Sequence, residues 1–217
     1  MKKLFWMMAA VVLLAGCSKD DENSLVNEPP TPQNGKTLVV YFSKTVPEGV
    51  DATTGATPTA TYKGQALGAT QYLATLVQEQ TGADVQRITV TDDHYPVEYN
   101  ALADVAKNER DNNIHPALTS THDLSQYQNI IIGMPVWWYT MPMPMYSFFD
   151  NVDLSGKNVY IFTTHAGSGL NNNPSRVKEV EPDANVSTDG LAISGDRVAQ
   201  NASSVTEWLT RIGLISK

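Results

Sequence analysis

Three short segments of the chain carry groups that could bind a ligand, and the first combines hydroxyls with a helix start. Ser43-Lys44-Thr45 directly follows an apolar run, and a helical pattern opens further on at Gly68-Ala69-Thr70. Hydroxyls and backbone N–H groups at a helix N-terminus suit a phosphate monoester, because the helix dipole favours an anion there. Neither a Walker GxxxxGK motif nor GxGxxG follows the run, so nucleoside triphosphates and dinucleotides are not favoured. The same Ser and Thr residues could equally serve as ordinary helix caps.

The second segment is an aromatic loop with proline on both sides. It reads Pro135-Val136-Trp137-Trp138-Tyr139 and is followed by Pro142 and Pro144. Neighbouring side chains diverge, so three adjacent aromatic residues cannot all face one core. We expect at least one of them to be available for stacking on a flat group, the alternative being that they cap the end of the sheet.

The third segment is rich in glycine and also follows an apolar run. It reads Thr163-Thr164-His165-Ala166-Gly167-Ser168-Gly169. Its glycines allow the backbone to approach a ligand closely, and its N–H groups and His165 can donate hydrogen bonds. Together the three segments would supply a phosphate cradle, an aromatic wall and a hydrogen-bonding backbone edge. That combination suits flavin mononucleotide (FMN).

Alternating strand and helix patterns predict how these segments are positioned. Short apolar or β-branched runs indicate five strands, at 37–42, 84–90, 129–133, 158–162 and 186–193, the last interrupted by Asp189-Gly190. Apolar residues at helical spacing predict helices at 69–77, 100–112 and 198–212, with Gly82 and Gly213 ending the first and last. Such alternation implies a doubly wound α/β domain whose parallel sheet is covered on both faces. Ligands bind beyond the carboxyl ends of the strands in such folds, where the three segments would meet.

The quoted motifs resemble those of the flavodoxin family over roughly residues 36–215. Tyr41-Phe42-Ser43-Lys44-Thr45 joined to Gly68-Ala69-Thr70 is similar to its phosphate loop, here split by an insertion at 46–64 that we expect to be irregular. The resemblance implies a three-layer α/β/α fold, a five-stranded sheet of order 2-1-3-4-5 and noncovalent FMN. By position it assigns phosphate contacts to Ser43, Thr45, Ala69 and Thr70. It assigns ring contacts to Pro135, Val136, Trp137, Trp138, Thr164, His165, Gly167 and Gly169.

The N-terminus has the pattern of a bacterial lipoprotein. Lys2-Lys3 precedes an apolar run of twelve residues, too short to span a bilayer but typical of a signal peptide. The run ends in Leu14-Ala15-Gly16-Cys17, which resembles a lipobox. We therefore predict a signal peptide at 1–16, lipid on Cys17, an acidic and proline-rich tether at 17–35 and a flavodoxin-like domain at 36–217. The mature protein would be anchored to a membrane at the periplasmic, outer-membrane or cell surface.

Composition and spacing disfavour several other functions. A net charge of −8 without a Lys/Arg cluster makes a nucleic-acid partner unfavourable. One cysteine allows no internal disulfide, and the four histidines show no metal-ligand spacing, so we expect no metal site. Ser168 lacks the G-x-S-x-G context of a hydrolase nucleophile.

Two functions are consistent with the sequence. One is an FMN protein that carries electrons or reduces a small flat substrate such as a quinone, with His165 as a candidate catalytic residue. The alternative is a non-catalytic surface lipoprotein that keeps the fold as a binding module with weak or no FMN. Residues 135–147 and 163–175 contain no Asp or Glu, and His165 could favour the charge that a flavin gains on reduction. We therefore expect a less negative potential than that of an electron-carrier flavodoxin, which would favour two-electron substrate reduction.

Overall fold

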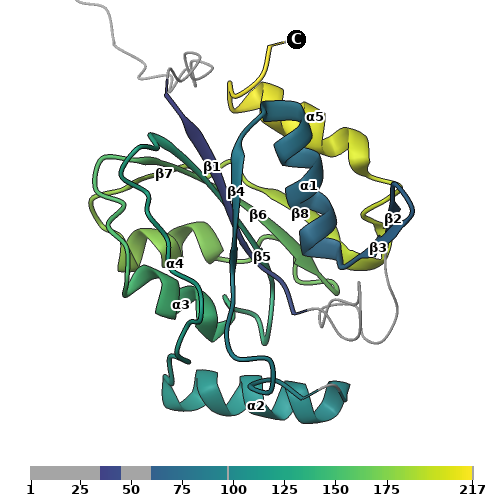
Figure 1. Cartoon of the computed structure of the whole chain (residues 1–217), viewed down its shortest axis with the longest axis vertical. Coiled ribbons are helices and arrows are strands. Elements are labelled where there is room, and N and C mark those ends of the chain that lie inside the picture. Colours follow the sequence, from purple (N-terminus) through teal and green to yellow (C-terminus); the bar gives the residue numbers. More distant parts are fainter. Residues whose placement is uncertain (1–34, 45–59, 97, 217) are drawn as a thin grey trace, which may run out of the picture.

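The computed structural model describes residues 35–44, 60–96 and 98–216, which form a parallel sheet with helices on both faces (Figure 1). The signal peptide, the lipidation site, most of the tether, Thr45 and insertion residues 46–59 lie outside these ranges. Within them, the strands have the order β4-β1-β5-β6-β7, and β8 also pairs with β6. The strands are β1 (Thr37–Phe42), β4 (Asp84–Ile88), β5 (Asn129–Pro135), β6 (Asn158–His165), β7 (Asn185–Val186) and β8 (Leu191–Ser194).

The sheet order confirms the predicted 2-1-3-4-5 pattern, with β7 and β8 sharing the fifth place. The chain leaves the sheet between these two short strands, as the Asp189-Gly190 interruption indicated. Asp189 there accepts a hydrogen bond from the Trp208 indole N–H at its carbonyl and pairs with Arg211 through its carboxylate. A Cβ on Gly190 would lie 2.9 Å from the carbonyl oxygen of Ile161, so only glycine fits this close approach.

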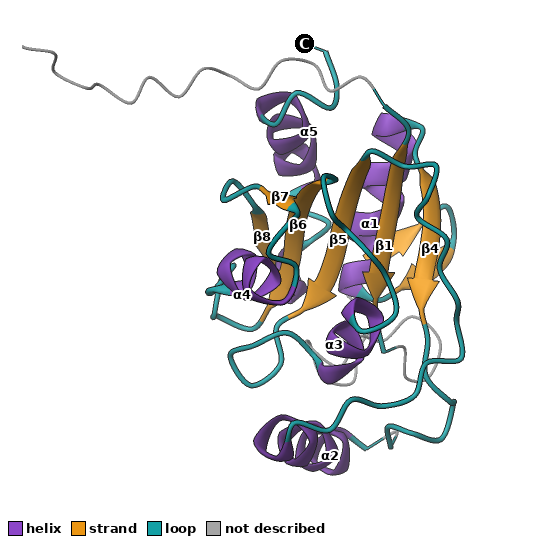
Figure 2. Ribbon diagram, turned by 90° about the vertical axis from the view of Figure 1, so that its left-hand side faces the viewer, coloured by secondary structure: helices purple, strands orange, loops and turns teal. Residues whose placement is uncertain are grey.

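Four helices cover the two faces of the sheet. Helices α1 (Ala69–Thr81) and α5 (Ala202–Arg211) pack on one face, where they bury Val39 and Tyr41 of β1. Helices α3 (Met143–Phe149) and α4 (Asn173–Val180) lie on the other face, which buries Val40 and Phe42 (Figures 1 and 2). The central strands are buried on both sides, which explains why their sequences are continuous apolar runs.

Helix α2 (Tyr99–Asn112) lies beyond the carboxyl ends of the strands and not on a face of the sheet (Figure 2). Its Leu102 and Ala106 are buried and Val105 is partly buried, in agreement with the predicted apolar stripe. That stripe is narrow, because the rest of the helix is polar, and it can cover an edge but not a sheet face. The placement of α2 therefore adds a wall at the edge where ligands bind in this class of fold.

Part of the insertion is regular, which corrects the expectation of an irregular excursion through residue 64. Strands β2 (Ala60–Tyr62) and β3 (Gln65–Leu67) form a two-residue hairpin through Lys63 and Gly64, both at positive φ. Positive φ at both positions defines a type I′ turn, the geometry that matches strand twist. The hairpin docks on α1, because Tyr62 packs edge-on against Tyr72 and both Tyr62 and Lys63 bind Glu79.

The last helix is shorter than predicted, although its apolar stripe is correct. Helix α5 starts at Ala202, and a 3-10 turn, η1 (Gly195–Arg197), precedes Val198. Val198 is fully buried in the same cluster as Val205 and Leu209. The periodic pattern therefore identified residues that share a core but not the point where the helix begins.

Candidate functional site

A cavity of about 420 Å³ lies at the carboxyl ends of β5 and β6. One wall is α2, and the others are the loops that follow the two strands. This volume is within the usual range for a small-molecule site, about 300–1,000 Å³. The lining residues from α2 are Tyr99, Leu102, Ala103 and Ala106, and those from the loops are Val136, Trp137, Trp138, Tyr139, Ala166, Gly167 and Ser168.

The loop after β5 is a tight turn that presents two aromatic rings. The backbone groups of Trp137 and Thr140 exchange hydrogen bonds of 3.1 and 3.0 Å, and Trp138 and Tyr139 between them have φ angles of 49° and 62°. This geometry is a type I′ turn, which normally contains Asn or Gly. Such backbone strain costs about 1–3 kcal/mol per residue and is concentrated at functional sites. Trp138 and Tyr139 are 39% and 72% exposed, so the turn holds large rings at the cavity mouth.

Trp137 occupies the opposite environment. It is buried, and its ring meets those of Phe42 and Tyr95 edge-on, with centroid distances of 5.4 and 5.2 Å. Its indole N–H is buried without an acceptor among the described residues. The three adjacent aromatic residues therefore divide between the core, where Trp137 lies, and the cavity mouth, where Trp138 and Tyr139 lie.

Helix α2 is tied to the aromatic turn by Trp138 and Arg110. The Trp138 indole N–H donates to the carbonyl oxygen of Ala103 at 2.9 Å. The Arg110 guanidinium lies 5.3 Å from the centre of the Trp138 ring and donates to the Trp138 carbonyl oxygen. These contacts fix Trp138 between the turn and the helix, so the cavity is formed largely in advance of any ligand.

A buried carboxylate connects the last turns of α2 to the loop that follows β4. The Glu109 side chain is 4% exposed and accepts a hydrogen bond from the Tyr95 hydroxyl at 2.7 Å. Its other oxygen lies 2.5 Å from Nε2 of His94. Burial, together with Glu109, raises the pKa of Tyr95, which keeps the phenol protonated as a donor. Glu109 therefore points into a buried polar cluster and serves to position α2.

The loop after β6 orients His165. Its Nδ1 accepts a hydrogen bond from the Gly167 N–H at 2.9 Å, and Gly167 has a φ of 115°. Burial lowers the pKa of His165, and Arg197 lowers it further, whereas the Asp196 carboxylate acts in the opposite direction. The lowered pKa favours the neutral imidazole, and because Nδ1 accepts from Gly167, the proton of that neutral ring is on Nε2. Sequence spacing gave no indication that Asp196 and Arg197, which follow β8, lie near this ring.

The start of α1 lies beside the end of β6. Ala69 and Thr70 in its first turn are fully buried, and the Thr70 hydroxyl lies 2.7 Å from that of Thr164. The N-cap residue Gly68 has no side chain to cap the helix. This contact joins a residue expected at the phosphate to one expected at the ring, so the two halves of the predicted site adjoin.

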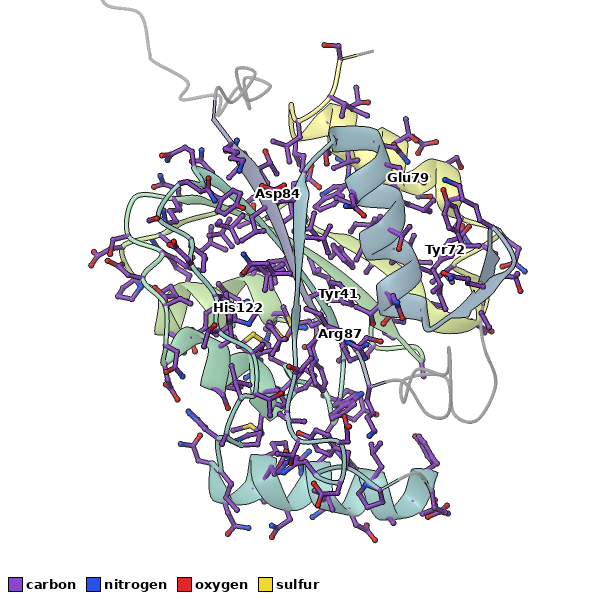
Figure 3. The ribbon with its side chains drawn as sticks, in the orientation of Figure 1. Tyr41, Tyr72, Glu79, Asp84, Arg87 and His122 are labelled. Carbon is purple, nitrogen blue, oxygen red and sulfur yellow. The ribbon has the colours of Figure 1, made fainter. Side chains whose placement is uncertain are left out.

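Two cations lie near the end of β1, where the phosphate loop begins. Ser43 is buried, and its carbonyl oxygen accepts a hydrogen bond from Arg87 Nη2 at 2.5 Å. Arg87 is the register partner of Tyr41, and Figure 3 shows the two near the carboxyl ends of β1 and β4. Lys44 lines a small cavity of about 130 Å³ together with Ser43 and Arg87. Burial lowers the pKa of Lys44. Arg87 was not predicted, because a single arginine in a weak strand pattern carries no sign of a site.

The structure places the predicted site residues that it describes in two groups. Those that line the large cavity are Val136, Trp137, Trp138 and Gly167. Those that lie at the neighbouring strand ends and the α1 start are Ser43, Ala69, Thr70, Pro135, Thr164, His165 and Gly169. Thr45 is outside the described residues. The α2 residues of the cavity were missed because their apolar stripe is indistinguishable from that of a core helix.

A doubly wound sheet with an aromatic and backbone-lined cavity at its carboxyl edge defines the flavodoxin-like class of α/β proteins. The chain belongs to the flavodoxin family: the family model Flavodoxin_4, described as Flavodoxin, matches residues 60–212. No match was found among proteins of curated function.

Solved structures agree with this assignment. Proteins of Bacteroides eggerthii and Bacteroides uniformis that are assigned as flavoproteins are each 25% identical, with a TM-score of 0.61. The matches cover 82% of this chain and 98% and 99% of those chains, respectively. A flavoprotein of Lactobacillus acidophilus, crystallised in complex with FMN, shares the fold at 21% identity and a TM-score of 0.52, covering 78% of this chain and 99% of its own.

Proposed function

We propose that this protein binds FMN noncovalently and serves as a redox protein. The observation that carries the proposal is the aromatic cavity at the carboxyl edge of the sheet, joined through Thr164 and Thr70 to the start of α1. A flavoprotein of the same fold was solved with FMN. When bound, FMN would supply the capacity to accept and release one or two electrons, which no amino-acid side chain here provides.

The described residues fit this cofactor. The flat ring system would lie in the cavity against Trp138 and the α2 side chains, which together form a largely apolar and aromatic wall. The backbone of Ala166, Gly167 and Ser168 lines the same cavity and could hydrogen-bond to the polar edge of the ring. The phosphate would lie near Ser43 and the first turn of α1, where Lys44 and Arg87 supply positive charge. Each end of FMN thus has a chemically matched environment.

Fluorescence titration tests the proposal directly. Addition of FMN to the purified protein is expected to quench flavin fluorescence at a 1:1 stoichiometry and to raise the melting temperature. Riboflavin, which lacks the phosphate, is expected to bind more weakly. If FMN produces neither quenching nor a thermal shift, the cofactor assignment is wrong, and the alternative of a binding module without FMN is favoured.

We further propose that bound FMN reduces a small flat substrate, such as a quinone, by two electrons. The large cavity has no Asp or Glu in its lining, so no adjacent carboxylate opposes the negative charge that a flavin gains on reduction. Replacement of His165 by alanine is expected to make the two-electron potential of the bound flavin more negative, because a nearby N–H donor is lost. Redox titration of both proteins measures this shift, and an unchanged potential would favour single-electron transfer.

Membrane attachment through lipid on Cys17 is a separate proposal. It is supported by the basic N-terminus, the apolar run and the single cysteine that follows it. Within the described ranges, none of the helices is long and apolar enough to cross a membrane. Metabolic labelling with palmitate, with Cys17→Ser as control, tests it: label and membrane fractionation are expected for the native sequence alone. Equal solubility of both forms would refute the anchor.

A further inference from the structure

A second cavity of about 300 Å³ adjoins the aromatic turn that also lines the first. Trp138 and Tyr139 of this turn line both cavities. Two arginines from different elements line the second cavity, Arg110 on α2 and Arg176 on α4. No Asp or Glu is among its lining residues, whereas the Asn113 amide and the Thr140 hydroxyl add neutral polar groups. We propose that this cavity binds the anionic group of a substrate, specifically the carboxylate of a flat aromatic acid.

Arg176 is the strongest evidence for an anion. Its guanidinium makes no side-chain hydrogen bond or ion pair with any residue that the structure describes, and only its Nε is buried, so the terminal Nη groups remain accessible to a ligand. A cavity lined by cations and by no carboxylate concentrates anionic ligands, because its uncompensated positive charge attracts them. A carboxylate matches the forked geometry of guanidinium donors and would pair this one.

The charges around the cavity leave it positive. Arg110 binds the adjacent Asp111, with Nε and Nη2 lying 2.8 and 2.5 Å from Oδ1. The same carboxylate binds Lys107 at 2.7 Å, so one anion is shared by two cations. The next carboxylate, Asp150, lies 2.5 Å from Nδ1 of His115. Arg176 is therefore not neutralised by these neighbouring acids.

The position of the cavity distinguishes a substrate from the cofactor phosphate. Arg176 belongs to α4, which covers the opposite sheet face from α1, where the phosphate of FMN is proposed to lie (Figure 1). An anionic group at Arg176 would place an attached aromatic ring across the Trp138–Tyr139 turn, next to the first cavity. The inference thus rests on the proposed function in taking the first cavity as the flavin site, and it adds the substrate class.

Calorimetry with two probes of equal shape tests the inference. We expect the FMN-loaded protein to bind 2-naphthoate about tenfold or more tightly than the neutral 2-naphthamide, the effect of one charge-assisted hydrogen bond. Added salt is expected to reduce this preference. Arg176→Gln is expected to abolish the preference, whereas Arg176→Lys retains part of it. The control Arg211→Gln, which removes a cation from the far end of α5, is expected to leave it unchanged.

Three results would overturn the inference. The first is equal binding of the two probes, and the second is a preference that survives Arg176→Gln. The third is an Arg176→Gln protein that binds FMN, but not riboflavin, more weakly, because the cavity would then hold the cofactor phosphate. If the proposed function itself is wrong, the fluorescence titration will show that FMN does not bind. The FMN-free protein still reports whether Arg176 selects a carboxylate, and its melting temperature shows that the variant is folded.

Discussion

At the scale of single residues, the site depends on an aromatic pair held in an unfavourable backbone conformation. Trp138 and Tyr139 both have positive φ, a region that bulky side chains rarely adopt. The turn hydrogen bonds between Trp137 and Thr140 and the contact of Asn171 with the Tyr139 carbonyl oxygen hold Tyr139 there. This backbone conformation lowers the stability of the fold, and it places the Tyr139 ring at the cavity mouth.

Replacement of Tyr139 separates these two effects. Tyr139→Gly is expected to raise the free energy of unfolding by about 1 kcal/mol, because glycine adopts positive φ without strain. Tyr139→Ala, which keeps the strain and removes the ring, is the control and is not expected to stabilise the fold. Both variants are expected to weaken FMN binding. Chemical denaturation and fluorescence titration measure the two quantities, and a Gly variant no more stable than the Ala variant would contradict the strain argument.

At the scale of elements, α2 is held at the sheet edge mainly by polar contacts. Leu102 and Ala106 are its buried apolar residues, and Glu109 connects its last turns to His94 and Tyr95. A helix with so few apolar contacts opens locally at lower free energy than the core does. The cavity wall is therefore expected to be more mobile than the sheet it covers.

Glu109→Ala is expected to loosen α2 while leaving the sheet intact. The change leaves the buried Tyr95 hydroxyl without its acceptor, at a cost of about 1–3 kcal/mol. Amide exchange is expected to accelerate across residues 99–112, with β5 and β6 unaffected, and FMN binding is expected to weaken. Glu179→Ala, an exposed change on α4, serves as the control. Unchanged exchange in α2 would show that its apolar contacts suffice.

Some elements of the fold could be predicted from the sequence, and others could not. The runs at 37–42 and 158–162 identified β1 and β6, because strands buried on both faces are continuously apolar. Helices α3 and α4 were not predicted, since each has only two turns and a proline near its start. The turn at Trp138 and Tyr139 could not be predicted either, because its geometry normally requires Asn or Gly. Local pattern thus located the sheet, whereas tertiary contacts formed the site.

At the scale of the whole molecule, the sheet is packed closely enough that Gly133, like Gly190, has no room for a side chain. A Cβ on Gly133, in the middle of β5, would lie 2.0 Å from the fully buried Phe162 ring on the adjacent strand. Gly133→Ala is expected to lower the free energy of unfolding by about 1–3 kcal/mol or more. Phe162→Leu in the same chain is expected to restore part of the loss, because the smaller side chain makes room. Denaturation of the single and double variants measures this coupling, and strictly additive effects would contradict it.

The stability of the whole molecule also depends on a partly buried histidine, His122. His122 lies on the loop beside β4 (Figure 3). Its Nδ1 is 2.9 Å from Gln86 Oε1 and its Nε2 is 2.9 Å from the Ser120 hydroxyl. Because Gln86 Oε1 can only accept, Nδ1 carries the proton and Nε2 accepts from Ser120. Burial lowers the pKa of His122.

Stability is therefore expected to fall as pH drops below about 6.5, the ordinary pKa of histidine. In that range the unfolded chain binds a proton that folded His122 does not, so acid favours unfolding. The lowered pKa of His165 has the same effect, whereas the raised pKa of Glu181 acts in the opposite direction. The test therefore compares the native protein with His122→Gln by chemical denaturation at pH 7.5 and 5.5. The loss of stability between the two pH values is expected to be smaller in the variant, and an equal loss would place the acid sensitivity elsewhere.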